Sequence, residues 1–133
     1  MILTTKARYA VTAIIDIADN GLKQPVSLVA ISKRQKISLS YLEQIFARLK
    51  KSGLVESIKG PGGGYNLSKA RDQITIAEVI NAIGETVKMT NCSNAKKSCI
   101  TTGVKCKTHH LWNGLENKIY EYLNSVSLQD ICK

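Results

Sequence analysis

Four residues whose side chains bind metals follow one another in the second half of the sequence: Cys92, Cys99, Cys106 and His109. Thiolates and a neutral imidazole are ligands both for zinc and for iron–sulfur clusters. The stretch 86–108 around the cysteines holds five lysines and no acidic or aromatic residue. The lysines favour the thiolate form of the cysteines. A stretch with so little apolar content gains its order from a bound metal. The sequence therefore predicts a metal-binding loop at 85–109.

The spacing of the ligands bears on which metal they bind. Cysteine pairs in zinc sites usually lie two to four residues apart, whereas six residues separate Cys92 from Cys99 and Cys99 from Cys106. An iron–sulfur cluster is larger, and histidine can replace cysteine on it. The spacing favours a cluster and leaves zinc and free thiols as alternatives. His110 is an alternative to His109, which the two-residue gap after Cys106 favours, and we expect the distant Cys132 to take no part.

Composition limits the kind of protein that carries this loop. The 133 residues have 44% hydrophobic content, enough for a folded core, and a net charge of +9. Twelve basic and four acidic residues lie in 1–71, so this part is expected to bind a polyanion. No apolar run approaches the roughly 18 residues of a membrane span. We therefore expect a cytoplasmic protein with reduced thiols and no membrane partner. No nucleophile–base or carboxylate pair is evident, so an enzyme is not expected.

Hydrophobic periodicity and capping residues predict five helices and one β-hairpin. The N-terminal caps expected are Thr5, Ser27, Ser40 and Thr75, and helix ends are expected at Gly21, Gly53 and Gly84. Strands are expected at 54–58 and 65–67, on either side of a glycine-rich turn. This order predicts a mainly α fold: a winged helix-turn-helix domain at 1–84, the loop 85–109, and a dimerisation helix with the C-terminal end at 110–133.

A helix-turn-helix places its second helix in the major groove of double-stranded DNA, with base contacts near its N-terminal end. The residues expected there are Ser38, Ser40, Tyr41, Glu43 and Gln44, with Arg48 on a phosphate further along. Lys33, Arg34 and Lys36 before the helix, and Lys50 and Lys51 after Arg48, are also expected to contact phosphates. Glu43 can accept from cytosine and Gln44 can pair with adenine. Glu43 also lies three residues after Ser40, where a capping-box partner belongs, so capping is an alternative role for it.

The glycine-rich turn is the predicted tip of the wing. Gly60, Gly62 and Gly63 would let its backbone approach DNA closely, and Lys59 would enter the minor groove. A nucleotide-binding loop is rejected because the turn lacks the G-K-[ST] ending and no helix follows it directly.

The last predicted helix has an apolar seam with helical spacing, formed by Leu111, Leu115, Ile119, Tyr122 and Val126. Such a seam either packs on the core or forms a dimer interface. We favour the interface, because a palindromic operator requires a two-fold symmetric dimer.

Two sequence runs are similar to those of bacterial winged-helix iron–sulfur cluster regulators: I-S-L-S-Y-L-E-Q at 37–44 and G-P-G-G-G-Y at 60–65, with L-T at 3–4 and R-Y-A-V at 8–11. The resemblance covers nearly the whole chain. It implies a homodimeric repressor that crosses its long last helices, with base contacts from Ser40 and Glu43 and the residue before the glycine tip in the minor groove.

The resemblance also implies a [2Fe–2S] cluster held by Cys92, Cys99, Cys106 and His109, and control of genes for cluster assembly. Two departures stand out: the cysteine gaps are six residues where the closest relatives have five, and Lys59 stands where arginine is common. Regulators of nitric oxide or iron response share the fold, and His109 favours the cluster-supply branch. A zinc-stapled DNA-binding protein remains an alternative, as does an iron–sulfur carrier from another class.

Overall fold

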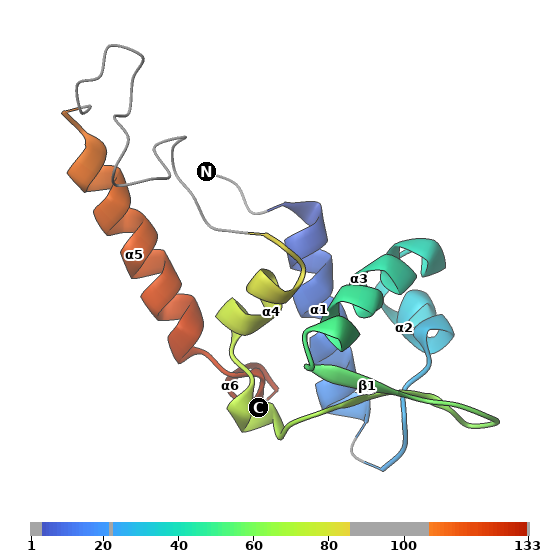
Figure 1. The fold of residues 1–133 in the computed structure, drawn as a ribbon. Coiled ribbons are helices and arrows are strands. Elements are labelled where there is room, and N and C mark those ends of the chain that lie inside the picture. The colour runs from blue at the N-terminus through green and yellow to red at the C-terminus, as the bar shows by residue number, and fades with distance from the viewer. Residues whose placement is uncertain (1–3, 22, 86–106, 133) are drawn as a thin grey trace.

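The computed structural model describes residues 4–21, 23–85 and 107–132, which form a mainly helical fold with one two-stranded sheet (Figure 1). The elements are α1 (Thr5–Asn20), α2 (Leu28–Gln35), α3 (Leu39–Lys51), β1 (Val55–Ile58), β2 (Gly64–Leu67), the 3-10 helix η1 (Arg71–Gln73), α4 (Ile76–Ala82), α5 (His109–Ser125) and α6 (Leu128–Ile131). The predicted fold class and the order of helix-turn-helix and hairpin are confirmed.

Two of the four predicted N-terminal caps are correct and two are displaced. Ser27 caps α2, and Thr75 caps α4 in a complete capping box with Glu78. α1 is capped by Thr4 rather than Thr5, because the hydroxyl of Thr4 accepts from the amide of Ala7. α3 is capped by Ser38 rather than Ser40, since the Ser38 hydroxyl accepts from the amide of Tyr41.

The early start of α3 has a packing reason. Ile37, directly before the cap, and Leu42, in the first turn, are both buried in the same apolar core. A hydrophobic residue before the cap that packs with one in the first turn fixes where the chain enters a helix. Ser40 therefore lies inside the first turn of α3, and the predicted capping box of Ser40 with Glu43 is wrong.

α1 is the central helix of the core. Its fully buried face is centred on Ala10, Ala13, Ile14 and Ile17, while Val11 and Ile15 are half-buried. Alanine side chains are short and let neighbouring helices approach α1 closely, and α1 contacts α2, α3, α4 and α6.

The hairpin is antiparallel, with Val55 opposite Leu67 and Ile58 opposite Gly64. A third segment joins it that the sequence analysis did not predict: the amide and carbonyl of Val26 exchange hydrogen bonds of 3.0 and 2.8 Å with those of Tyr65. The Cβ of any other residue at Gly64 would collide with the main-chain carbonyl of Val26. The entry to the helix-turn-helix is thereby fixed against the end of the strands that adjoins the glycine-rich turn.

The C-terminal end returns to the core after α5. Thr75 and Ser127 form an isolated β-bridge, and the side chain of Leu128 is fully buried. α6 packs against α1 and η1 and was not predicted. The spacing of Ser127 and Asp130 is that of a capping box and could have indicated the helix.

Candidate DNA-binding surface and metal-ligand segment

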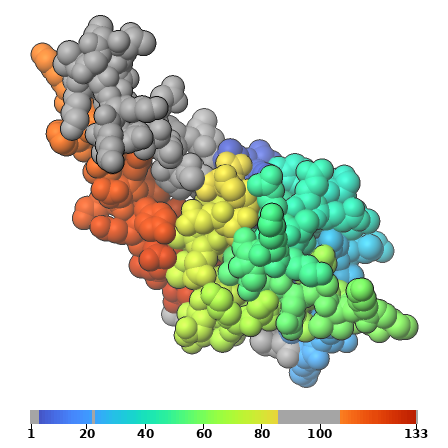
Figure 2. Space-filling view, in the orientation of Figure 1, coloured from blue at the N-terminus to red at the C-terminus, as the bar shows by residue number. Residues whose placement is uncertain are grey.

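The outer face of α3 presents the residues expected to read bases. Ser40, Glu43 and Gln44 are exposed on the first turns of the helix. Figure 2 shows α3, in teal to green, at the molecular surface beside the hairpin, which projects from the edge of the molecule opposite α5. The hydroxyl of Ser38 is engaged in capping at 3.3 Å from the amide of Tyr41. Glu43 makes no capping hydrogen bond, because Ser38 is the N-cap of α3. Its carboxylate is therefore available to a DNA base.

Tyr41 packs inward rather than lying fully on the surface. It is half-buried, and its ring meets that of Tyr9 on α1 edge to face, with centroids 5.5 Å apart. Such a geometry stabilises an aromatic pair beyond the area it buries. The contact holds the start of α3 against α1, a role that the sequence analysis did not assign to Tyr41.

Arg34, expected to contact DNA phosphate, makes instead an ion pair with a buried carboxylate. Its Nε and Nη2 donate to the two carboxylate oxygens of Asp16 at 3.0 and 2.6 Å, and Gln35 donates to Asp16 at 2.8 Å. Burial opposes ionisation of Asp16, but the hydrogen bonds from Arg34 and Gln35 outweigh it and hold its pKa below the usual value. The pair fastens α2 to α1, while Lys33 and Lys36 remain exposed.

Two basic side chains of α3 also make contacts within the protein. Arg48 donates from Nη1 to the carbonyl of Ile83 at 2.9 Å. Lys50 donates to the hydroxyl of Ser57 on β1 at 2.9 Å. These two bonds set the position of α3 relative to α4 and to the wing.

The backbone of the wing's tip depends on its glycines, and its contact with DNA stays a prediction. Lys59 is exposed at the end of β1. Gly60 and Gly62 have φ of 97° and 74°, which favour glycine, and a Cβ at Gly63 would collide with the carbonyl of Ile58. The glycines are thus required by the turn itself, and the turn places Lys59 beside its tip.

The proposed metal ligands are only partly described by the structure. Cys92, Cys99 and Cys106 lie outside the described residues. His109 is the first residue of α5 and half-buried, and its ring centroid lies 5.5 Å from that of His110. Within the described residues no group of three or more metal-binding side chains gathers. Three thiols and an imidazole are, by their chemistry, a donor set that fits a four-ligand metal centre.

Cys132, the fourth cysteine of the chain, packs against the core at the end of α6. Burial, together with a hydrogen bond to Asp19, raises the pKa of its thiol. The thiolate, the form that binds metals, is therefore disfavoured at Cys132.

The apolar seam of α5 divides along the helix. Leu111, Leu115 and Tyr122 are 60%, 39% and 67% exposed, whereas Ile119 is half-buried. Val126, directly after α5, packs on the core. α5 runs along one edge of the molecule, with α4 between it and α1 (Figure 1). The described part of the chain leaves much of this helix uncovered.

A helix-turn-helix made of α2 and α3, joined to a glycine-tipped wing, defines a winged-helix DNA-binding regulator. The Rrf2 family, described as iron-dependent transcriptional regulators, matches residues 3–133, and the chain belongs to this family. Its relatives and structural neighbours are transcriptional regulators, so the expectation that the chain is no enzyme is confirmed.

Several relatives are similar over almost the whole chain. A putative HTH-type transcriptional regulator of Azotobacter vinelandii is 51% identical over 98% of this chain and 79% of its own length. The HTH-type transcriptional regulator IscR of Xenorhabdus nematophila is 50% identical over 100% of this chain and 80% of its own.

Two solved structures support the fold. The global cysteine regulator CymR of B. subtilis has a TM-score of 0.79 at 30% identity and covers 99% of this chain and 96% of its own. T. potens IscR has a TM-score of 0.78 at 32% identity, over 98% and 85%. Among the described helices none is both long and apolar enough to cross a membrane.

Proposed function

We propose that this regulator senses iron–sulfur cluster status through a [2Fe–2S] cluster and controls genes for cluster assembly. The observation that carries the proposal is the donor set of Cys92, Cys99, Cys106 and His109 in a chain whose relatives named IscR are about half identical over its full length. These four residues would hold the cluster. When bound, it would supply a redox-sensitive centre that is lost more easily because one ligand is an imidazole.

The position of His109 gives the loop a way to affect the rest of the chain. His109 begins α5, so a ligand bond at its ring would restrain the end of the loop against this helix. Ordering of a metal-binding segment is coupled to the binding energy of the metal. Occupancy of the loop would thereby change which DNA sites the protein prefers.

DNA recognition is assigned to the exposed side chains of α3 and to the wing. Ser40, Glu43 and Gln44 would face base edges in the major groove, and Lys59 the minor groove. Lys59 offers a point charge rather than the planar fork of arginine, so base preference under the wing would be loose.

The protein would act as a homodimer in the cytoplasm on a palindromic operator. The exposed apolar residues Leu111, Leu115 and Tyr122 of α5 support this assembly, since side chains of this kind are uncommon on a monomer surface when they lie along one helix. A two-fold axis between paired helices would place two copies of α3 on successive turns of the duplex.

The test is anaerobic purification followed by visible absorption and by iron, sulfide and zinc analysis, with selection of binding sites from random duplex DNA. We expect a reddish-brown protein with equal iron and sulfide, and a selected site that changes when Cys99→Ala removes the cluster. A colourless protein with about one zinc per chain would overturn cluster sensing and leave a zinc-stapled DNA-binding protein. A coloured protein that selects no DNA site would indicate an iron–sulfur carrier.

A further inference from the structure

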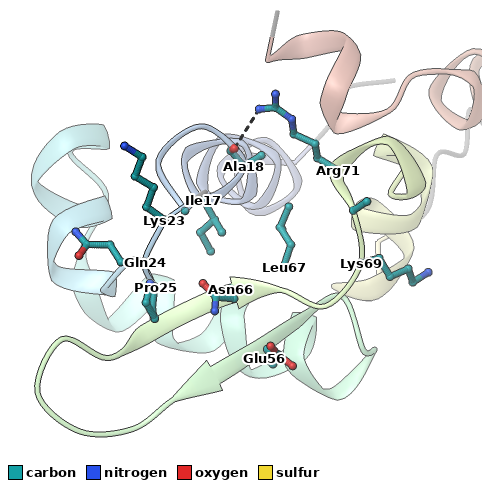
Figure 3. A pocket seen from close by; sticks show the side chains of 12 residues that line it. Ile17, Ala18, Lys23, Gln24, Pro25, Glu56, Asn66, Leu67, Lys69 and Arg71 are labelled. Carbon is teal, nitrogen blue, oxygen red and sulfur yellow. Dashed lines mark hydrogen bonds between the residues drawn. The ribbon is translucent and has the colours of Figure 1, made fainter.

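A cavity of about 350 Å³ lies behind the wing. Figure 3 shows it between the C-terminal end of α1, the loop that leads to α2, and the hairpin. Ile17 of α1 and Leu67 of β2 supply apolar walls. Pockets for small molecules begin at about 300 Å³, so this one has room for a single small ligand.

One polar atom in its wall has no partner. The side-chain oxygen Oδ1 of Asn66 is buried and accepts no hydrogen bond within the described structure. A buried acceptor without a donor is destabilising, and such atoms are rare in folded proteins. The torsion that turns an asparagine amide is soft. Asn66 can therefore present its oxygen to a donor that enters the cavity.

The charged residues around the cavity favour an anion. Three basic residues, Lys23, Lys69 and Arg71, line it together with one acidic residue, Glu56. Lys69 pairs with Glu78 at 3.2 Å and points away from the cavity in Figure 3.

The other two basic residues differ in how far they are already engaged. Arg71 donates to the carbonyl of Ala18 at 3.2 Å and to Gln129 at 2.6 Å. Lys23 stands exposed at the rim and makes no ion pair within the described residues. Lys23 is thus the cation with the fewest contacts to give up, and its side chain, which is directed away from Asn66 in Figure 3, would turn inward to meet a carboxylate in the cavity.

We propose that this cavity binds a small carboxylate that bears an amino or hydroxyl group on the neighbouring carbon. The carboxylate would face Lys23, the N–H or O–H would donate to Asn66, and a short aliphatic part would lie against Ile17 and Leu67. Both polar contacts are needed, because the anion alone would leave Asn66 without a donor.

Four probes of one carbon skeleton test the proposal on the full-length protein. L-Alanine and L-lactate carry both groups, propionate lacks the donor, and L-alaninamide lacks the carboxylate. Titrations followed by the side-chain amide signal of Asn66 in ¹H–¹⁵N spectra should give saturation by alanine, lactate or both, with a Kd near or below about 1 mM. Propionate and alaninamide should bind at least about tenfold more weakly, the loss expected for one hydrogen bond to a charged or buried group.

Three variants complete the experiment. Asn66→Leu should weaken binding by about tenfold or more. Lys23→Gln, in an exposed loop and harmless to folding, should also weaken it. Lys69→Gln is the matched control that should leave the affinity unchanged. The proposal is overturned if neither alanine nor lactate binds at a concentration of about 10 mM, tenfold above the expected Kd. It is also overturned if propionate binds as tightly as they do, or if Lys23→Gln leaves the affinity unchanged.

Discussion

The guanidinium of Arg48 on α3 donates to the main-chain carbonyl of Ile83 at the end of α4, over 2.9 Å. The bond joins α3, the helix proposed to read DNA, to the residues directly before 86, where the segment with the cysteines begins. The last carbonyls of a helix carry partial negative charge and favour a cation. Arg48 is thus a link between two elements, whereas its position in the sequence suggests a contact to phosphate.

Arg48→Ala should therefore lower the free energy of unfolding by about 1 kcal/mol, because the Ile83 carbonyl loses a charged donor. The salt dependence of DNA affinity should change little. Lys51→Ala is the control, since Lys51 is exposed at the end of the same helix. If Lys51 contacts a phosphate, its loss reduces the slope of log K against log salt by about 0.9. Urea unfolding and binding titrations at several salt concentrations measure both. A slope change in Arg48→Ala without loss of stability would assign Arg48 to phosphate.

Glu43→Ala should change which DNA sequences bind without changing stability. Ser38, and not Ser40, caps α3, so the Glu43 carboxylate has no backbone amide to satisfy. Site selection from random duplexes should lose a base preference worth about 1–3 kcal/mol at one position. Ser38→Ala is the reciprocal control and should cost about 1 kcal/mol of unfolding free energy. If Glu43→Ala is destabilised and its selected DNA site is unchanged, the role of Glu43 is structural.

Arg34→Ala should destabilise the protein by about 2 kcal/mol at neutral pH, because it leaves the buried carboxylate of Asp16 without its cation. This loss of unfolding free energy is smaller than for a fully buried pair, because the side chain of Arg34 is 42% exposed. Lys33→Ala, on the exposed neighbour, should have little effect.

The same pair predicts an acid dependence. The folded-state pKa of Asp16 is lowered from 3.8, so its contribution is complete above the unfolded-state pKa and is lost as the pH falls through the folded-state value. The difference in stability between the wild type and Arg34→Ala, measured by urea unfolding, should therefore be constant from pH 7 to about 5 and shrink below about 4. A difference that grows in acid would contradict this assignment.

Gly64→Ala should detach the wing from the entry to α2. A Cβ at this position meets the carbonyl of Val26, whose hydrogen bonds to Tyr65 would have to break. We expect a loss of about 2 kcal/mol or more, and faster exchange of the Val26 and Tyr65 amides with deuterium. Gly62→Asn is the comparison, because the space around Gly62 is open and asparagine tolerates positive φ. Equal stability of the two variants would contradict the close contact at Gly64.

Local patterns in the sequence were sufficient for the helix-turn-helix, the hairpin and its glycine tip, and for the capping box of Thr75 with Glu78. Each depends on residues a few positions apart, whose spacing sets the local backbone. The four metal-binding residues, the basic half of the chain and the apolar seam of α5 are likewise visible from residue type and spacing alone.

Only the tertiary structure decided which side chains make contacts within the protein. Arg34 meets Asp16, Arg48 meets Ile83, Tyr41 meets Tyr9, and Val26 joins Tyr65. Each pair joins segments 18 to 39 residues apart, and no local periodicity encodes such contacts. The start of α3 at Ser38 was decided in the same way: two serines could cap the helix equally well, and the burial of Ile37 and Leu42 in the common core selected the first.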